Sequence, residues 1–385
     1  MERRRFLVGA CSLLVGTSGF GRAVVAKPCP PDLTGSGSST LCGATGLSLA
    51  EAAQALTHGQ STHFTKNNLQ RENDIQWQVQ TVWFDPSRHE IQYMGKPASS
   101  QSRDYSHYIY DETSDRWSTS GMNLFPGTGH IWNVTFDPTN GDYWFRRYDD
   151  NALRWFDRSD GTNGRWKQTA EQTSPALNSG NTNFAAMGWH PNLFGPGKPG
   201  IFIWAVFRFF AYNLATQEFS VLNPNNFSSS SPFWNRSTGQ ALFLPGTDQL
   251  ICFAQNEGNG HPAILVDAGA GNSSDIITDG FVTTTSAPPI QVYGGGGDSN
   301  HGHVVNHPNN ANRLLLLEEH GTSRVWESAD YGATWNLQAY RHPFQAMNNW
   351  SAGEFTVGTI SQYGIVVGIA SNSEGGENVI WKPGA

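Results

Sequence analysis

The chain has 385 residues, of which 15% are charged, 12% are aromatic and 42 are glycine, and its formal net charge is −8. A net negative charge with no stretch of clustered basic residues argues against binding to the phosphate backbone of nucleic acids. Abundant glycine and aromatic residues with few charges are typical of many short strands joined by turns. We therefore expect an all-β protein that does not bind nucleic acid.

Residues 1–26 have the features of an export signal. Three arginines at positions 3–5 precede Phe6-Leu7, an apolar stretch broken by small residues follows, and Val24-Val25-Ala26 offers a small-residue cleavage site. Arg3-Arg4-Arg5-Phe6-Leu7 resembles the twin-arginine signature, which implies that a bacterium exports the protein already folded. The apolar stretch is too short and too rich in glycine to span a bilayer. We expect a periplasmic or secreted protein with no stable membrane span.

Residues 27–75 form an N-terminal segment ahead of the repeats. Cys29 and Cys42 flank a loop rich in proline, glycine and serine, so they are candidates for a disulfide in an oxidising compartment. Residues 48–56 are the one segment with a helical pattern, with Ser48 and Glu51 spaced as a capping box. Cys252 lies in an apolar run typical of a strand, which predicts a buried structural thiol rather than a nucleophile.

Residues 76–385 contain a repeat of roughly 45 to 55 residues. Several apolar strands end in a turn that contains proline: Val82–Pro86, Val134–Pro138, Met187–Pro191 and Val305–Pro308. Between the third and fourth of these, Phe233–Gly239 is predicted to have the same role, with Trp234-Asn235 in place of Asp-Pro. A second hairpin then closes four of the units: Tyr108–Trp117, Leu153–Trp166, Phe210–Phe219 and Val325–Trp335.

A four-stranded unit with this period is typical of a β-propeller blade. A single blade cannot cover its own apolar faces, so the blades must stack around an axis. Five units are clear, and the gap between Asn235 and His307 and the region Phe355–Trp381 leave room for one or two more. We predict one propeller of six or seven four-stranded antiparallel blades over residues 76–385. A β-sandwich is the less favoured alternative because sandwiches lack this period.

One of the hairpins carries a specific motif. Ser328-Ala-Asp-Tyr-Gly-Ala-Thr-Trp335 matches Ser-x-Asp-x-Gly-x-Thr-Trp at every defined position and resembles the Asp box, the bacterial neuraminidase repeat of sialidases and other propellers. The earlier hairpins resemble kelch-type blade closings. Asp330 can accept hydrogen bonds from turn amides, Gly332 can supply positive φ, and Trp335 can pack between blades. We expect this motif to stabilise the fold and to take no part in catalysis.

The resemblance to sialidases would imply three arginines that hold a carboxylate, a tyrosine nucleophile paired with a glutamate, and an acid/base aspartate. Candidates for the arginines are Arg103, Arg147, Arg208 and Arg324, and candidates for the tyrosine are Tyr340 and Tyr363. The Phe/Tyr-Arg-Ile-Pro segment of sialidases is absent from the sequence, and only one complete Asp box is present.

Propeller geometry predicts where a ligand binds. The loops that enter the first strand of each blade and those between its second and third strands share one face around the axis. In this sequence these loops are polar and aromatic, and apolar rings beside hydrogen-bonding groups suit a sugar. We predict a carbohydrate ligand there, with these substrate-binding residues: Trp77, His107, Trp132, Asn183, Arg208, Asn300 and Trp350.

The segment Gly294–His307 holds the densest group of polar residues. His301 and His303 are two residues apart, so on a strand they would face the same side. A structural role, sugar binding or acid/base catalysis, and metal binding are all open, but the spacing with His307 matches no specific zinc motif and we expect no cofactor.

A neutral histidine could abstract the proton next to a uronate carboxylate, with arginine neutralising that carboxylate and tyrosine protonating the leaving oxygen. By composition, such a set resembles the sites of propeller polysaccharide lyases. The candidate catalytic residues are Tyr105, His130, Arg147, His301, His303 and Glu354.

Two classes of function follow. The first is an exported carbohydrate-active propeller that cleaves glycosidic bonds, as a hydrolase or a lyase. The second is a non-catalytic propeller that binds glycan or protein at the cell surface, and we expect a monomer in either case. A metal- or redox-dependent oxidase is disfavoured because the sequence has no clustered cysteines or metal motif. A hydrolase needs two carboxylates about 5 to 10 Å apart, for which the candidates are Asp104, Glu257, Asp298 and Glu354.

Overall fold

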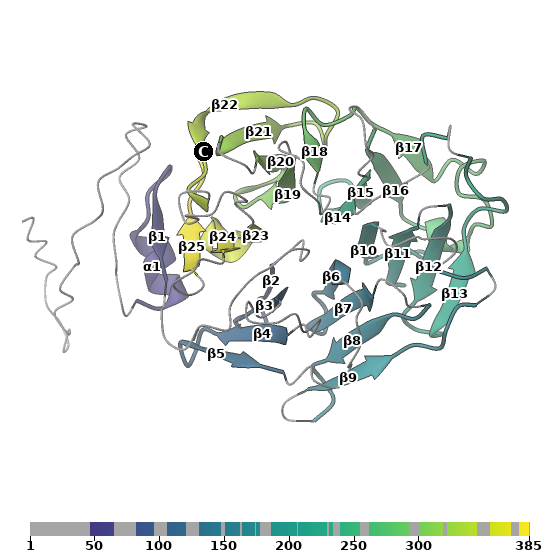
Figure 1. The fold of residues 1–385 in the computed structure, drawn as a ribbon, viewed down its shortest axis with the longest axis horizontal. Helices are drawn as coiled ribbons and strands as arrows, with labels where there is room; N and C mark the ends of the chain where they lie inside the picture. The colour runs from purple at the N-terminus through teal and green to yellow at the C-terminus, as the bar shows by residue number, and fades with distance from the viewer. Residues whose placement is uncertain are drawn as a thin grey trace, which may run out of the picture.

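The structure is a computed structural model. It describes residues 47–64, 82–95, 106–120, 131–147, 151–161, 164–173, 175–177, 186–205, 207–228, 231–233, 239–254, 262–292, 301–318, 322–344, 355–370 and 377–384. At residues 95, 106, 131–133, 147, 254, 291, 301, 370 and 377 it describes the backbone only. The described strands form six sheets arranged around one axis (Figure 1). The predicted all-β propeller is therefore confirmed, with six blades.

The first three blades follow the repeat along the chain. Blade 1 contains β2 (Trp83–Asp85), β3 (Glu90–Gly95), β4 (Ser106–Asp111) and β5 (Arg116–Thr119). Blade 2 contains β6 (Ile131–Asp137), β7 (Asp142–Arg147), β8 (Arg154–Asp157) and β9 (Arg165–Gln168). Blade 3 contains β10 (Ala186–His190), β11 (Gly200–Trp204), β12 (Phe209–Asn213) and β13 (Glu218–Val221). In each, the first strand lies next to the axis and the fourth lies at the rim.

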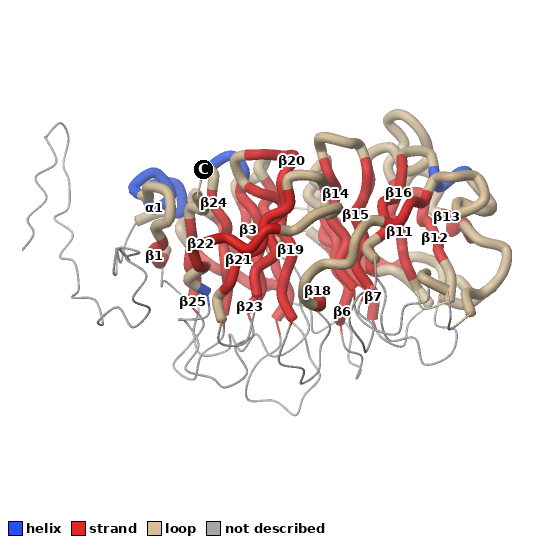
Figure 2. The backbone as a smooth tube through the Cα atoms, turned by 90° about the horizontal axis from the view of Figure 1, so that it is seen from above, coloured by secondary structure: helices blue, strands red, loops and turns tan. Residues whose placement is uncertain are grey.

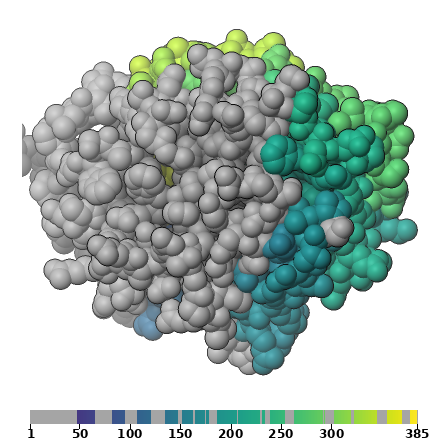
Figure 3. Space-filling view, turned by 45° about the vertical axis from the view of Figure 1, so that its right-hand side comes forward, coloured from purple at the N-terminus to yellow at the C-terminus, as the bar shows by residue number. Residues whose placement is uncertain are grey.

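Blades 4 and 5 each carry an addition to this pattern. Blade 4 contains β14 (Gly239–Leu244), β15 (Gln249–Ala254), β16 (Ile264–Asp267) and β17 (Val282–Thr284), with the 3-10 helix η1 (Ala270–Asn272) between its last two strands. Blade 5 contains β19 (His301–His307), β20 (Asn310–Glu318), β21 (Arg324–Ser328) and β22 (Asn336–Arg341), and the short β18 (Gln291–Val292) pairs in parallel with β19. Figure 3 shows the surface of blades 2 to 4, coloured teal to green, along one side of the molecule.

Blade 6 joins the two ends of the described chain. It contains β23 (Phe355–Ile360), the 3-10 helix η3 (Ser361–Tyr363), β24 (Ile365–Ala370) and β25 (Glu377–Trp381), and its outermost strand is β1 (Ser61–His63). β1 pairs antiparallel with β25, with Thr62 opposite Ile380. The propeller therefore begins within the segment that the sequence analysis placed ahead of it. A strand of three residues with no proline turn does not show in the repeat pattern.

The helix α1 (Leu49–Ala55) precedes this closing strand. Its predicted capping box is present: the Glu51 carboxylate accepts a hydrogen bond from the Ser48 N–H (2.9 Å), and the Ser48 hydroxyl accepts one from the Glu51 N–H (3.4 Å). The buried face of α1, which includes Leu49 and Ala52, packs with side chains of blades 1 and 6. The helix thus covers the outside of the joint at which the ring closes.

The turns after the first strands explain why either Asp-Pro or His-Pro can stand at this point of the repeat. Asp85 and Asp137 each accept a hydrogen bond from the backbone N–H two residues later, at 2.8 and 2.9 Å. His190 and His307 take the same place, and Nδ1 of each accepts from the N–H two residues later, at 2.9 and 3.2 Å. Either side chain offers an acceptor to the turn amide, so either residue type closes the turn.

Blade 4 differs from the prediction. Its first turn lies at residues 245–248, between β14 and β15, and not at Phe233–Gly239. Phe233 instead packs against Phe209 (ring centroids 5.7 Å apart), and its carbonyl accepts a hydrogen bond from Trp204 Nε1 (2.7 Å). The repeat pattern does not predict this turn because Leu244, which precedes Pro245, has no side-chain acceptor like those of the Asp-Pro and His-Pro turns.

The motif at residues 328–335 makes the structural contacts predicted for it. Asp330 accepts hydrogen bonds from the Thr334 N–H (2.8 Å) and the Thr334 hydroxyl (2.6 Å). Gly332 has φ +86°, and the Trp335 ring lies 6.5 Å from that of Phe253 in blade 4. The motif thus fixes a turn of blade 5 against its neighbour. Cys252 of β15 is fully buried, as predicted, and burial raises the pKa of its thiol.

Candidate functional site

Most residues of the predicted carbohydrate site lie outside the described residues. These are Trp77, Tyr105, His130, Asn183, Asn300, Trp350 and Glu354, together with the hydrolase carboxylates Asp104, Glu257 and Asp298. Cys29, Cys42 and Arg103 also lie outside them. For Trp132, Arg147 and His301 the structure describes only the backbone, in β6, β7 and β19. The carbohydrate site on that face therefore stays a prediction.

His107 lies in the core between blades 1 and 2. Its ring centroid is 4.9 Å from that of Tyr143, 5.0 Å from Phe156 and 5.3 Å from Trp166, and Nδ1 lies 3.0 Å from the Ser120 hydroxyl. The residue has no exposed surface, and burial lowers the pKa of the imidazole to about 3. His107 is thus a neutral packing residue in this structure, where the sequence analysis expected an exposed sugar contact.

His303 is also fully buried, with its ring 5.3 Å from that of Phe355 in blade 6. Arg208 lies half-buried near the rim, where Nε donates to Asn226 Oδ1 (2.6 Å) and Nη1 to the Asn223 carbonyl (3.3 Å). The structure thus separates these two residues from one another and from His107. Their protein contacts hold loops and blades together.

The other residues considered for sialidase chemistry have structural partners as well. Arg324 forms a two-pronged ion pair with the buried carboxylate of Glu318. The Tyr363 hydroxyl donates to Glu112 Oε2 (2.7 Å), and burial raises the pKa of this tyrosine to about 12. Burial also raises the pKa of Tyr340 to about 12. A raised pKa disfavours the phenolate form of both tyrosines at neutral pH.

A pocket opens on the axis of the propeller, on the face that carries the turns between first and second strands. We call it the axial pocket; it encloses about 280 Å³. Each blade contributes the residue two positions before its first turn begins, and these six are Phe84, Phe136, Trp189, Phe243, Asn306 and Thr359. Side-on, the strands run between this turn-bearing edge and the opposite face (Figure 2). The axial pocket is therefore a ring of equivalent positions.

The ring is divided into an aromatic part and a polar part. Blades 1 to 4 supply aromatic side chains, whereas blades 5 and 6 supply Asn306 and Thr359. The polar part is bonded together: the Thr359 hydroxyl donates to the Asn306 carbonyl (2.6 Å), and Asn306 Nδ2 donates to the Phe243 carbonyl (3.0 Å). The mouth is formed by exposed residues that include Pro86, Pro138 and Gln362. None of the described residues that line the pocket is charged.

Two lining residues carry buried polar atoms with no hydrogen-bond partner among the described residues. These atoms are Nε1 of Trp83 and Oδ1 of Asn306. An unsatisfied buried polar group costs about 1–3 kcal/mol. Since these atoms have almost no exposed surface, a water molecule or a ligand hydroxyl would reach them only if the side chains around them shifted.

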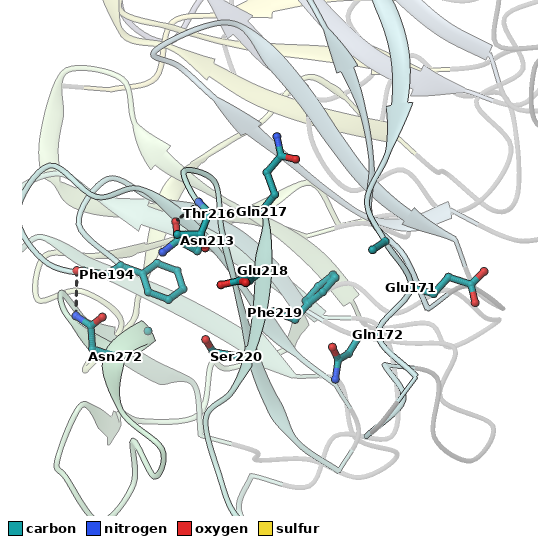
Figure 4. A pocket seen from close by; sticks show the side chains of 12 residues that line it. Glu171, Gln172, Phe194, Asn213, Thr216, Gln217, Glu218, Phe219, Ser220 and Asn272 are labelled. Carbon is teal, nitrogen blue, oxygen red and sulfur yellow. Dashed lines mark hydrogen bonds between the residues drawn. The ribbon is translucent and has the colours of Figure 1, made fainter.

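A second hollow lies at the rim, around the outer strand of blade 3 (Figure 4). We call it the rim groove; it encloses about 640 Å³. Its lining comes from three blades: residues 170–172 that follow β9, Asn213 and residues 216–220 of the β12–β13 hairpin, and Gly271 and Asn272 of η1, with Phe194 beside them. Unlike the axial pocket, it contains two carboxylates, Glu171 and Glu218.

Among the residues that the structure describes, no group of three or more His, Cys, Asp and Glu side chains is arranged to hold a metal ion. No helix in the described part of the chain is long and apolar enough to cross a membrane.

Sequence reasoning missed the axial pocket, although a signal was present. An aromatic residue stands two positions before the turn proline in each of the first four blades, as in Phe84-Asp-Pro86 and Phe243-Leu-Pro245. The repeat predicts the number of blades, but by itself it does not show that these aromatics meet at one point. Their convergence on the axis becomes visible only when all six first strands are placed around it.

No protein-family model matches the chain, and no curated protein sequence matches it. Solved structures with a similar arrangement include a Bacteroides thetaiotaomicron protein of unknown function, with 8% identity and a TM-score of 0.48 over 80% of this chain and 70% of that one. An auxiliary nutrient binding protein from the same organism has 13% identity and a TM-score of 0.47 over 80% and 69%. A fungal alcohol oxidase in complex with copper has 7% identity and a TM-score of 0.47 over 84% and 75%. Similarity at this level carries no conclusion about function.

Proposed function

We propose that this protein is an exported β-propeller that binds carbohydrate, and that its axial pocket holds one neutral sugar unit. The division of the axial ring carries the proposal. A sugar presents apolar C–H faces and a rim of hydroxyls, which suit aromatic rings on one side and an amide and a hydroxyl on the other. The uncharged lining favours a neutral sugar over a uronate or a sialic acid.

The size of the pocket supports a single unit. Small-molecule sites commonly enclose about 300–1,000 Å³, and the axial pocket, at about 280 Å³, is just below that range. The described lining holds no carboxylate pair and no ionisable group. This favours recognition over catalysis at this pocket.

Binding can be measured by saturation-transfer difference NMR with methyl glycosides of neutral hexoses and pentoses. We expect at least one to bind with a Kd of about 1 mM or tighter. Trp83→Phe keeps an aromatic ring beside Phe136 but reduces the apolar face that the pocket offers to a sugar, so it should weaken that binding about fivefold. Leu337→Ala, at an exposed position in blade 5 away from the pocket, is the matched control.

Failure of every glycoside to bind, or equal affinities for the wild type and Trp83→Phe, would remove the basis for a sugar in the axial pocket. Cleavage of glycosidic bonds, by a hydrolase or a lyase, would depend on the opposite face. A screen of neutral and anionic polysaccharides, read by new reducing ends and by ultraviolet absorbance, tests that activity separately.

A further inference from the structure

The rim groove surrounds the outer edge of β13, the outermost strand of blade 3, and no described strand pairs with this edge. Glu218 and Ser220 point to the side of Phe194 and Asn272, whereas Phe219 points to the side of Gln172 (Figure 4). The groove therefore has a wall on each side of the strand. The space between the walls is the position that a fifth strand of blade 3 would take.

The wall from blade 4 is firmly held. The Gly271 N–H donates to the Leu193 carbonyl (2.7 Å), and Asn272 Nδ2 donates to the Phe194 carbonyl (3.0 Å). The Phe194 ring packs so closely on Gly200 and Gly271 that a Cβ at either glycine would lie within 2.7 Å of it. This wall cannot easily move in to cover the strand edge.

The wall from blade 2 is also fixed by backbone hydrogen bonds. The Gln172 N–H donates to the Asn151 carbonyl (2.8 Å), and the Leu177 N–H donates to the Gln172 carbonyl (3.2 Å). Both walls thus exist before any partner arrives, so a peptide would enter a preformed slot and lose less ordering entropy in doing so.

The hydrogen-bond register shows which backbone groups face the slot. The Leu222 N–H donates to the Phe209 carbonyl (3.0 Å) and the Gln217 N–H to the Asn213 carbonyl (2.9 Å). Since bonded and non-bonded pairs alternate in an antiparallel ladder, the N–H and C=O groups of Phe219 and Val221 point away from β12. These are the groups to which an added strand bonds.

The charges of the groove select the occupant. Glu171 and Glu218 are both exposed, one on each side of the strand, while the remaining lining residues are neutral. The whole chain carries a net charge of −8. We infer that β13 binds an extended, basic peptide segment of a partner protein as a fifth strand of blade 3, with lysine or arginine side chains beside Glu171 and Glu218. Blade 6 already takes its outer strand, β1, from a distant part of the chain. This inference is independent of the axial pocket.

The probe is a fluorescein-labelled peptide, acetyl-Lys-Thr-Val-Thr-Val-Lys-amide, with a second peptide that carries Glu in place of both Lys. Fluorescence anisotropy should show that the Lys peptide binds at least about tenfold tighter than the Glu peptide, and that added salt weakens it. Val221→Pro removes an outward N–H without removing a bond to β12, so it should abolish binding in a folded protein.

The matched control is Thr119→Pro in β5 of blade 1. The Ser120 N–H donates to the His107 carbonyl (3.0 Å) as the Leu222 N–H does to Phe209, so Thr119 occupies the position of Val221 in its own blade. Thr119→Pro should bind the Lys peptide as the wild type does. If Val221→Pro does not fold, Glu171→Gln with Glu218→Gln, both at exposed positions, should still weaken the Lys peptide about tenfold.

Three results would overturn the inference. One is the absence of Lys-peptide binding at about 1 mM, and another is equal binding by the wild type and a folded Val221→Pro. A dimer in sedimentation that Val221→Pro dissociates would replace the basic partner with a second copy of this chain.

Discussion

The indole of Trp83 stacks on the phenyl ring of Phe136, with ring centroids 5.9 Å apart and 17° between the planes. Trp83 belongs to blade 1 and Phe136 to blade 2, and both line the axial pocket. The aromatic wall of the pocket is therefore also a joint between blades. Phe136 is 3% exposed, so Phe136→Ala should lower the free energy of unfolding by about 3–5 kcal/mol, measured by urea titration. A loss below about 1 kcal/mol would mean that this joint contributes little.

The closing strand of the ring offers a second prediction. The Lys382 N–H donates to the Gln60 carbonyl (2.9 Å) and the Phe64 N–H to the Asn378 carbonyl (3.3 Å), so by alternation the N–H of Thr62 faces β25. Thr62→Pro should therefore cost about 3 kcal/mol or more, seen as a lower unfolding midpoint and faster amide exchange in β25. Thr119→Pro, whose replaced N–H faces outward, should cost much less. Equal losses would contradict this account of the closure.

Acid should destabilise the protein through its buried histidines. Burial lowers the pKa of His107 to about 3 and also lowers the pKa values of His190 and His307, each from 6.5. Below about pH 6.5 the unfolded chain binds protons at these histidines that the folded chain does not. The contribution of the neutral histidines to the free energy of unfolding is therefore complete above pH 6.5 and is lost progressively toward pH 3. Asp142 acts in the opposite sense, because burial raises its pKa to about 6.

His107→Phe isolates the largest of these effects. The variant removes one titrating group, so its free energy of unfolding should fall less than that of the wild type between pH 7 and pH 4.5. Urea titrations at four pH values across this range measure the difference. Parallel curves would show that His107 does not set the pH dependence.

Asp330 tests the role of the motif in blade 5. Asp330→Ala removes the acceptor of the Thr334 N–H and hydroxyl bonds, and it should cost about 1–2 kcal/mol of stability. Glycoside binding, measured by NMR, should not change. A variant of normal stability that has lost ligand binding would instead assign Asp330 to a functional site.

Export stays a prediction from the sequence alone. A reporter fused to residues 1–30 should reach the periplasm only in cells with a working twin-arginine translocase. Arg3→Lys with Arg4→Lys should retain the reporter in the cytoplasm. Unchanged transport of that variant would point to a different export route.

The sequence predicted those parts of the fold that depend on local chemistry. The capping box of Ser48 and Glu51, the Asp-Pro and His-Pro turns and the second hairpins all depend on contacts between near neighbours, and all are present. The first turn of blade 4 could not be predicted because Pro245 follows a leucine. The strand β1 could not be predicted because its partner, β25, is distant in the chain. The axial pocket required the relative placement of six strands, which no local pattern contains.

The closing pair also imposes an order on biosynthesis. Thr62 and its partner Ile380 are separated by 318 positions in the chain. At about 5–20 residues per second, β1 leaves the ribosome roughly 15 to 60 s before the strand to which it will bond. Blades 1 to 5 are made one after another during that interval, and until β25 follows they are stabilised only by contacts between neighbouring blades. The nascent protein is then an open arc of blades and not a closed ring. A chaperone that retains the first 64 residues would therefore delay ring closure without preventing the formation of the other blades.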